Sequence, residues 1–207
     1  MLFSRSRFLL FFIRIEYNRR NINNMDIFSH GLWAAAAAKG VNKSQNKRRV
    51  NVWATAMWGI FPDLFAFVIP FAWMIVAFIS GDISGGDFHV RPAGEELTNP
   101  NMVVVSQFSH ALYNMSHSLF IFAIVFLGVW LYFRQARLEL LGWLLHIVID
   151  IPTHTAAFFP TPIFWPFFDW KFLYGFSWGQ PWFLILNYSL LACLYLYFWK
   201  GKKKLYS

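Results

Sequence analysis

The sequence predicts an all-α, polytopic membrane bundle with about four transmembrane spans and a short N-terminal helix. Hydrophobic residues make up 57% of the 207 residues and aromatic residues 21%, whereas charged residues make up only 14%. Soluble domains carry more charge, so this composition is typical of a protein that lies in lipid. The net charge of +8 does not indicate a nucleic-acid partner, because the basic residues form short clusters between apolar stretches.

Residues 1–24 differ in composition from the rest of the chain. They carry five arginines around a short apolar segment at residues 8–13. A secretory signal needs a longer apolar stretch and a small-residue cleavage site, and neither is found here. We therefore expect residues 1–24 to be an N-terminal extension, with Met25 as the natural start and residues 25–207 as the membrane-embedded domain.

The first two predicted elements of that domain are a short helix and a long apolar stretch. Residues 27–38 are rich in alanine and would form a helix of ~18 Å, too short to cross a ~30 Å hydrocarbon core alone. Residues 52–79 are long enough, but Gly59, Pro62 and Pro70 interrupt them. Broken helices at membrane depth are tolerated where they line a cavity or pack against protein.

Three further apolar stretches complete the predicted bundle. Residues 102–133 form the second stretch, with the span itself expected to begin near His117. The third span is expected at 138–158 and the last at 181–199. Each is long enough for a transmembrane helix.

The connecting segments predict the orientation of the spans. Segments 39–49, 134–137 and 200–204 are basic, which places them in the cytoplasm by the positive-inside rule. Segments 80–101 and 159–180 are acidic or neutral and are expected outside. A chain that crosses the membrane four times places all three basic segments in the cytoplasm and both acidic or neutral segments outside. We therefore expect a multi-pass inner-membrane protein with a cytoplasmic C-terminus.

Ionisable residues inside the apolar stretches are the candidates for function. A charged group in lipid costs several kcal/mol, so its presence indicates a functional site by default. The apolar stretches hold seven such residues: His30, Asp63, His117, Glu139, His146, Asp150 and His154. Six of the seven are His or Asp, the residue types that bind zinc and similar metals.

The third predicted span shows the clearest pattern. His146, Asp150 and His154 are spaced i, i+4 and i+8, which places them on one stripe of a helix. Pro152 can kink that helix before His154, so the direction of His154 is less well defined. By helix rise, Asp63, Asp150, His117 and His154 lie ~18–25 Å from the cytoplasmic ends of their spans, at similar depths, whereas His146 is shallower at ~12 Å. A proton relay, or separate histidines that each bond a neighbouring helix, would use the same residue types.

Five short motifs resemble a known family. The segment from Met25 and Asp26 to His30 is similar to the start of bacterial inner-membrane proteins classed as metal-dependent hydrolases (LexA-regulated inner-membrane hydrolase-like). The other four, in the family's order, are Pro62-Asp63, Ser116-His117-Ser118, His146 with Asp150, and Trp165-Pro166-Phe167. The resemblance runs from residue 25 to about residue 168. Many members carry a His-Arg pair where this chain has residues 112–115. His110, two turns before His117, is a candidate substitute, although a structural role is favoured for it.

These patterns together predict a buried site for a divalent metal ion, with zinc expected. The predicted ligands are His30, Asp63, His117, His146 and Asp150, and Asp63 is also the candidate catalytic base. The resemblance implies hydrolysis, in which the metal would act as a Lewis acid and lower the pKa of bound water to ~7. We expect membrane lipids around the protein and a lipid-like ester or phosphoester as substrate. The alternatives are a non-catalytic membrane protein with a structural metal or a His/Asp network, and a small proton or metal transporter.

Overall fold

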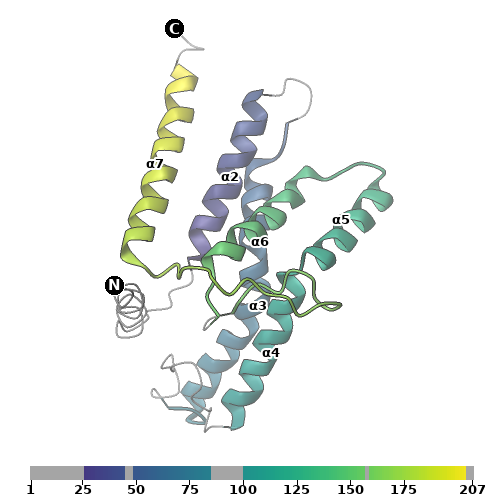
Figure 1. Ribbon diagram of the computed structural model, residues 1–207, viewed down its shortest axis with the longest axis vertical. Coiled ribbons are helices and arrows are strands. Elements are labelled where there is room, and N and C mark those ends of the chain that lie inside the picture. The colour runs from purple at the N-terminus through teal and green to yellow at the C-terminus, as the bar shows by residue number, and fades with distance from the viewer. Residues whose placement is uncertain (1–25, 45–48, 85–99, 157–158, 204–207) are drawn as a thin grey trace, which may run out of the picture.

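The computed structural model describes residues 26–44, 49–84, 100–156 and 159–203, which confirm the predicted all-helical membrane fold. These residues hold six α-helices and one 3-10 helix, and none of them lies in a β-strand (Figure 1). The predicted extension, residues 1–24, lies outside the described part. The elements are α2 Ile27–Ser44, α3 Val52–Ser80, α4 Pro100–Ser116, α5 Leu119–Phe133, η2 Leu138–Leu140, α6 Leu141–Thr153 and α7 Pro181–Lys203.

Fewer helices than predicted are long enough to cross a membrane. Helices α3 and α7 qualify, and α4 and α5 qualify together as one pair bent by 55°. The described residues therefore hold two to three candidate spans by length and composition, and the predicted count of about four is approximate. The described part of the predicted third span (138–158), which ends at residue 156, holds η2 and the 13-residue α6, and a helix of that length covers ~20 Å. The outer surface is strongly apolar, as Val68, Ile69 and Val76 on α3 illustrate, which suits contact with lipid.

The boundaries of α2 and α3 correct two expectations. Helix α2 does not end at residue 38 but continues to Ser44, so residues 39–44 are helical rather than a loop. Lys39 and Lys43 lie over the rings of Tyr195 and Tyr197 on α7, and these cation–π contacts tie the extended end of α2 to its neighbour. Helix α3 runs without interruption through Pro62 and Pro70, where breaks were expected.

The predicted second span is two helices rather than one. Helix α4 ends at Ser116 and α5 begins at Leu119, so the span does not simply start near His117. The Ser118 hydroxyl caps α5 by accepting hydrogen bonds from the backbone N–H groups of Phe120 and Ile121. This N-cap starts a new helix in a new direction. The break presents His117 to the centre of the bundle, where it is fully buried.

Glycines allow α2, α3 and α6 to approach one another closely. A Cβ atom on Gly142 of α6 would lie 2.2 Å from the backbone oxygen of Thr55 on α3. A Cβ on Gly59 of α3 would lie 2.6 Å from the Cβ of Ala34 on α2. Small residues at such contacts let helix backbones pack tightly in membranes. The close packing brings the polar residues of three helices within reach of one another.

One hydrogen bond ties the end of α4 to α6. The indole N–H of Trp143 donates to the backbone oxygen of Ser116 at 2.6 Å, in a buried setting. We expect Trp143→Phe to lower the free energy of unfolding by about 1 kcal/mol, because the buried carbonyl loses its partner. Thermal unfolding in detergent measures this change. Trp58→Phe is the control, since Trp58 stacks on Trp143 and its indole nitrogen has no hydrogen bond to any described residue; an equal effect in both variants would contradict the prediction.

Candidate metal centre

Four of the five predicted ligand residues meet at one point in the core of the bundle. One ligand atom from each lies within 4.8 Å of the others, and all four residues are buried. Asp63 comes from α3, His117 from the break between α4 and α5, and His146 and Asp150 from successive turns of α6. Residues far apart in sequence therefore converge, as the matched depths predicted.

The distances between the donor atoms fit a tetrahedral ion site. The Nε2 atoms of His117 and His146 lie 3.0 Å apart. Asp150 Oδ2 lies 3.2 Å from the first and 3.1 Å from the second, and Asp63 Oδ1 lies 3.6 Å from both. Ligands bound to zinc at ~2.0–2.1 Å in a tetrahedron are ~3.3 Å apart, so the observed distances bracket that value.

A backbone carbonyl lies beside the Nδ1 atom of each histidine. His117 Nδ1 lies 3.1 Å from the backbone oxygen of Tyr113, and His146 Nδ1 lies 2.7 Å from that of Gly59. A carbonyl only accepts, so His146 Nδ1 carries the proton and its Nε2 presents a lone pair. His117 Nδ1 also lies 2.9 Å from the Ser116 hydroxyl, which can donate or accept, and with its proton on Nδ1 the His117 Nε2 presents a second lone pair. Two lone pairs that face each other at 3.0 Å repel unless a cation lies between them. The same carbonyl-to-imidazole contact orients metal-ligating histidines in general.

The carboxylates point to the same conclusion. Asp63 Oδ2 and both oxygens of Asp150 are buried without a hydrogen bond from any residue that the structure describes. A buried carboxylate oxygen without a hydrogen-bond donor is costly, whereas coordination to a cation offsets that cost. The residues present therefore fit a divalent metal ion.

Local features of α3 and α4 set up this geometry. Pro62 lacks an N–H group, so the backbone oxygen of Trp58, one turn earlier, receives no helical hydrogen bond from position 62. Gly59 in that turn supplies the carbonyl that His146 uses. On the other side, the ring of Tyr113 stacks on His117 with centroids 3.7 Å apart. Tyr113 is fully buried and was not singled out from the sequence, because one tyrosine among many aromatic residues gives no signal.

Of the other histidines that the structure describes, two lie near the cluster and one lies away from it. His30 Nε2 lies 3.2 Å from Asp150 Oδ1, the oxygen that faces away from His117 and His146. His154 Nδ1 lies 3.6 Å from the same oxygen and 3.3 Å from the backbone oxygen of Asp150. His110 instead stacks on Phe159, with centroids 4.3 Å apart. The structure thus places His30 beside the four-residue cluster rather than within it.

The segment at 159–180 covers the cluster. Trp178 is buried and meets the His30 ring edge-on, with centroids 5.1 Å apart. The Ser118 hydroxyl donates to the backbone oxygen of Trp165 at 2.6 Å, which fastens the segment to the start of α5. A Cβ on Gly175 would lie 2.0 Å from the backbone oxygen of His154, so the segment also packs tightly on the end of α6. Segment 159–180 therefore packs against His30, Ser118 and His154 beside the cluster.

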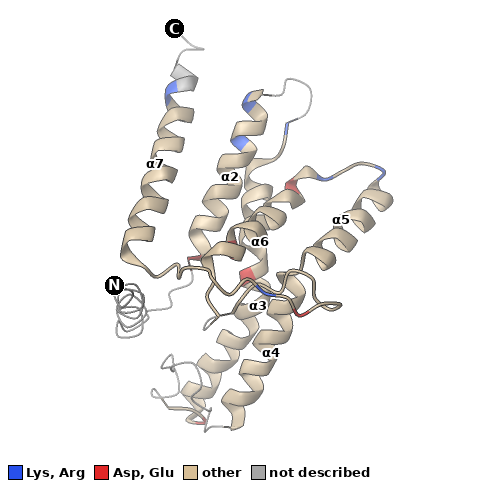
Figure 2. Cartoon of the chain, in the orientation of Figure 1, with Lys and Arg blue, Asp and Glu red and all other residues tan. Residues whose placement is uncertain are grey.

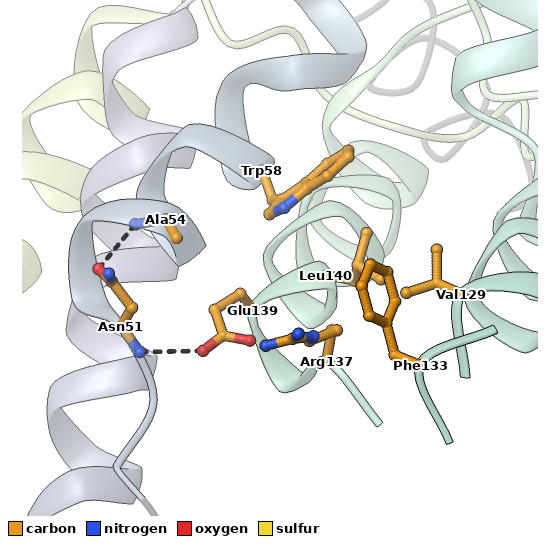
Figure 3. A pocket seen from close by; sticks show the side chains of 8 residues that line it. All are labelled: Asn51, Ala54, Trp58, Val129, Phe133, Arg137, Glu139 and Leu140. Carbon is orange, nitrogen blue, oxygen red and sulfur yellow. Dashed lines mark hydrogen bonds between the residues drawn. The ribbon is translucent and has the colours of Figure 1, made fainter. Parts of the chain in front are cut away.

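A separate cavity of about 410 Å³ lies at the start of α3. Figure 3 shows Trp58, Phe133, Arg137 and Glu139 among its lining residues. Glu139 accepts a hydrogen bond from the backbone N–H of Asn51 at 3.2 Å, which serves the N-terminal end of α3. The cavity contains no histidine and none of the clustered carboxylates, so it is not the candidate centre.

Comparison with protein families decides the class of protein. One family matches residues 25–206, which is most of the chain. This chain belongs to the YdjM inner membrane protein family. Membership confirms the expected inner-membrane family, while the family description names no reaction. No curated protein and no solved structure matched this YdjM-family chain.

Proposed function

We propose that this YdjM-family protein is a membrane-embedded, metal-dependent hydrolase that acts on a lipid-like ester or phosphoester. The observation that carries the proposal is the pair of imidazole Nε2 atoms that face each other at 3.0 Å beside two carboxylates. Such a donor set binds a divalent ion, with zinc as the expected metal. A bound ion would polarise the substrate and lower the pKa of water.

The residues of the chain would then orient the reactants and move the proton. Asp63 Oδ1 faces the two histidines, while its Oδ2 has no hydrogen bond from any described residue. That second oxygen is the proposed proton acceptor during attack and the donor to the leaving group. The cover over the cluster would exclude bulk water from the reaction. The apolar outer surface of the bundle favours a substrate that arrives from the membrane.

Turnover by purified protein tests the proposal. A panel of carboxylic esters, phosphodiesters and phosphomonoesters with acyl chains would be assayed for wild type, Asp63→Asn and His110→Ala. We expect Asp63→Asn to lower turnover by about 10²–10⁴-fold, because asparagine keeps an oxygen near the site but cannot accept the proton. His110→Ala should retain activity, since His110 lies on Phe159 and away from the cluster. Unchanged turnover in Asp63→Asn would contradict the role given to this residue.

A structural metal site is the second candidate function. Four protein ligands close a zinc site, whereas catalytic sites keep one position open to water. The four clustered residues are only 0–1% exposed, which suits a closed site that ties helices together. Under this alternative, a chelator lowers the thermal stability of the protein and no substrate in the panel is turned over. Under the hydrolase proposal, the chelator also abolishes a measured activity.

The orientation of the bundle remains a prediction from its charge. Figure 2 shows Lys and Arg gathered at the end of the bundle where α2 and α7 end and α5 meets η2. We expect this end to face the cytoplasm. In a Cys193→Ser background, Lys43→Cys and Lys200→Cys should resist a membrane-impermeant maleimide in intact cells and react after permeabilisation. Phe168→Cys, at an exposed position of segment 159–180, should react in intact cells. The reverse labelling pattern would overturn this orientation.

A further inference from the structure

We propose that the centre holds two divalent cations and that the Asp150 carboxylate bridges them. The first ion would be bound by the four-residue cluster, and the second by His30, His154 and Asp150 Oδ1. This inference rests on the metal-binding part of the proposed function and not on hydrolysis. It assigns His30, the fifth predicted ligand, to a separate ion.

The two oxygens of Asp150 face different pairs of histidines. Oδ2 lies 3.2 Å from His117 Nε2 and 3.1 Å from His146 Nε2. Oδ1 lies 3.2 Å from His30 Nε2 and 3.6 Å from His154 Nδ1. A carboxylate that serves two ions places one oxygen in each ligand set, and this division of neighbours is what such a bridge requires.

Hydrogen bonding does not account for these contacts. Neither carboxylate oxygen of Asp150 has a hydrogen bond with suitable geometry from a described residue, although imidazole nitrogens lie within 3.1–3.6 Å. Ligands that share a zinc-like ion are ~3.3 Å apart and direct their lone pairs to a common point rather than at each other. In the competing arrangement, His154 Nδ1 carries the proton and donates to the backbone oxygen of Asp150 at 3.3 Å as a cap for α6, so that this nitrogen binds no ion. A His154 variant distinguishes the two arrangements, because it loses an ion only if His154 is a ligand.

The two ions would differ in their open positions. The first has four protein ligands and is closed, whereas the second has three and leaves a position for water or substrate. Catalytic two-metal sites hold their ions ~3.5–4 Å apart and clamp the attacking and leaving oxygens. Four neutral histidines and two carboxylates would leave a net charge of +2 around two divalent ions. An anionic phosphoryl group neutralises that charge, so the two-ion centre favours a phosphoester over a carboxylic ester.

Metal stoichiometry and ion–ion coupling test the proposal on the full-length protein in detergent. Elemental analysis should find two zinc ions per chain in wild type, one in His30→Gln and one in His154→Gln. In protein reconstituted with Mn²⁺, electron paramagnetic resonance should show an exchange-coupled pair in wild type. The same measurement should show an isolated ion in His30→Gln, because its second site is lost.

Two controls keep the result interpretable. His110→Gln changes a histidine that contacts Phe159 and should keep two coupled ions. Size-exclusion and thermal unfolding in detergent identify folded variants, and only folded variants are scored. One ion in wild type, or two coupled ions in His30→Gln, would overturn the bridge. Two coupled ions without turnover of any substrate would uphold the bridge and refute the hydrolase proposal. A single ion with turnover would refute the bridge and uphold the hydrolase proposal.

Discussion

Asp150→Ala is expected to remove the bound metal while the helical bundle stays folded. Asp150 is the residue that contacts all four histidines near the centre, through one oxygen or the other. Loss of a residue that merely orients a metal ligand typically costs 10–100-fold in affinity. Loss of this shared ligand should therefore weaken binding by more than about 100-fold. Elemental analysis of protein purified from metal-replete cells measures the result.

The bundle should survive this change because its helices do not depend on the metal to form. In lipid, each helix satisfies its own backbone hydrogen bonds, unlike a zinc finger that is unfolded without its ion. His117→Ala should likewise lose metal, and His110→Ala on the same helix pair should retain it. Metal-free wild-type protein would favour a His/Asp network without an ion. Metal kept in both Asp150→Ala and His117→Ala would mean that other residues hold it.

Most of the candidate metal site could be predicted because polar residues in apolar stretches stand out. The i, i+4 spacing of His146 and Asp150 already placed both on one helical face, and helix rise matched the depths of Asp63 and His117. The structure brings these four residues together. His30 was expected among them because a short α2 could tuck into the bundle. Its actual position, on the far oxygen of Asp150, depends on side-chain directions that spacing does not define.

The helix boundaries were harder to predict for a physical reason. Pro62 and Pro70 indicated breaks in α3, but packing against neighbouring helices tolerates proline within a membrane helix. The basic composition of residues 39–44 predicted a loop. These residues continue α2 instead, and Lys39 and Lys43 make cation–π contacts with tyrosines on α7. Gly142 and Gly59 are ordinary residues in the sequence, and only the three-dimensional structure shows that they touch neighbouring backbones.

Gly142→Ala is expected to destabilise the bundle and weaken metal binding together. The added Cβ would lie 2.2 Å from the backbone oxygen of Thr55 and 3.0 Å from the backbone nitrogen of Gly59, whereas ordinary contacts begin at about 3.4 Å. Neither atom can rotate away, so α6 must move back from α3. Forced shifts of this kind in a packed interior cost about 1–3 kcal/mol.

The same movement would separate the metal ligands. His146 lies one turn after Gly142 on α6, and its Nδ1 contact at 2.7 Å is to Gly59, the residue that the new Cβ would push. A shift of ~1 Å changes every distance in a site whose ligands must lie ~3.3 Å apart, so we expect at least a tenfold loss of metal affinity. Gly128→Ala on α5 is the matched control, because a Cβ there meets nothing within 4 Å. Thermal unfolding and metal titration of the two variants in detergent measure both effects. If Gly142→Ala and Gly128→Ala behave alike, close contact between α3 and α6 does not position the metal ligands.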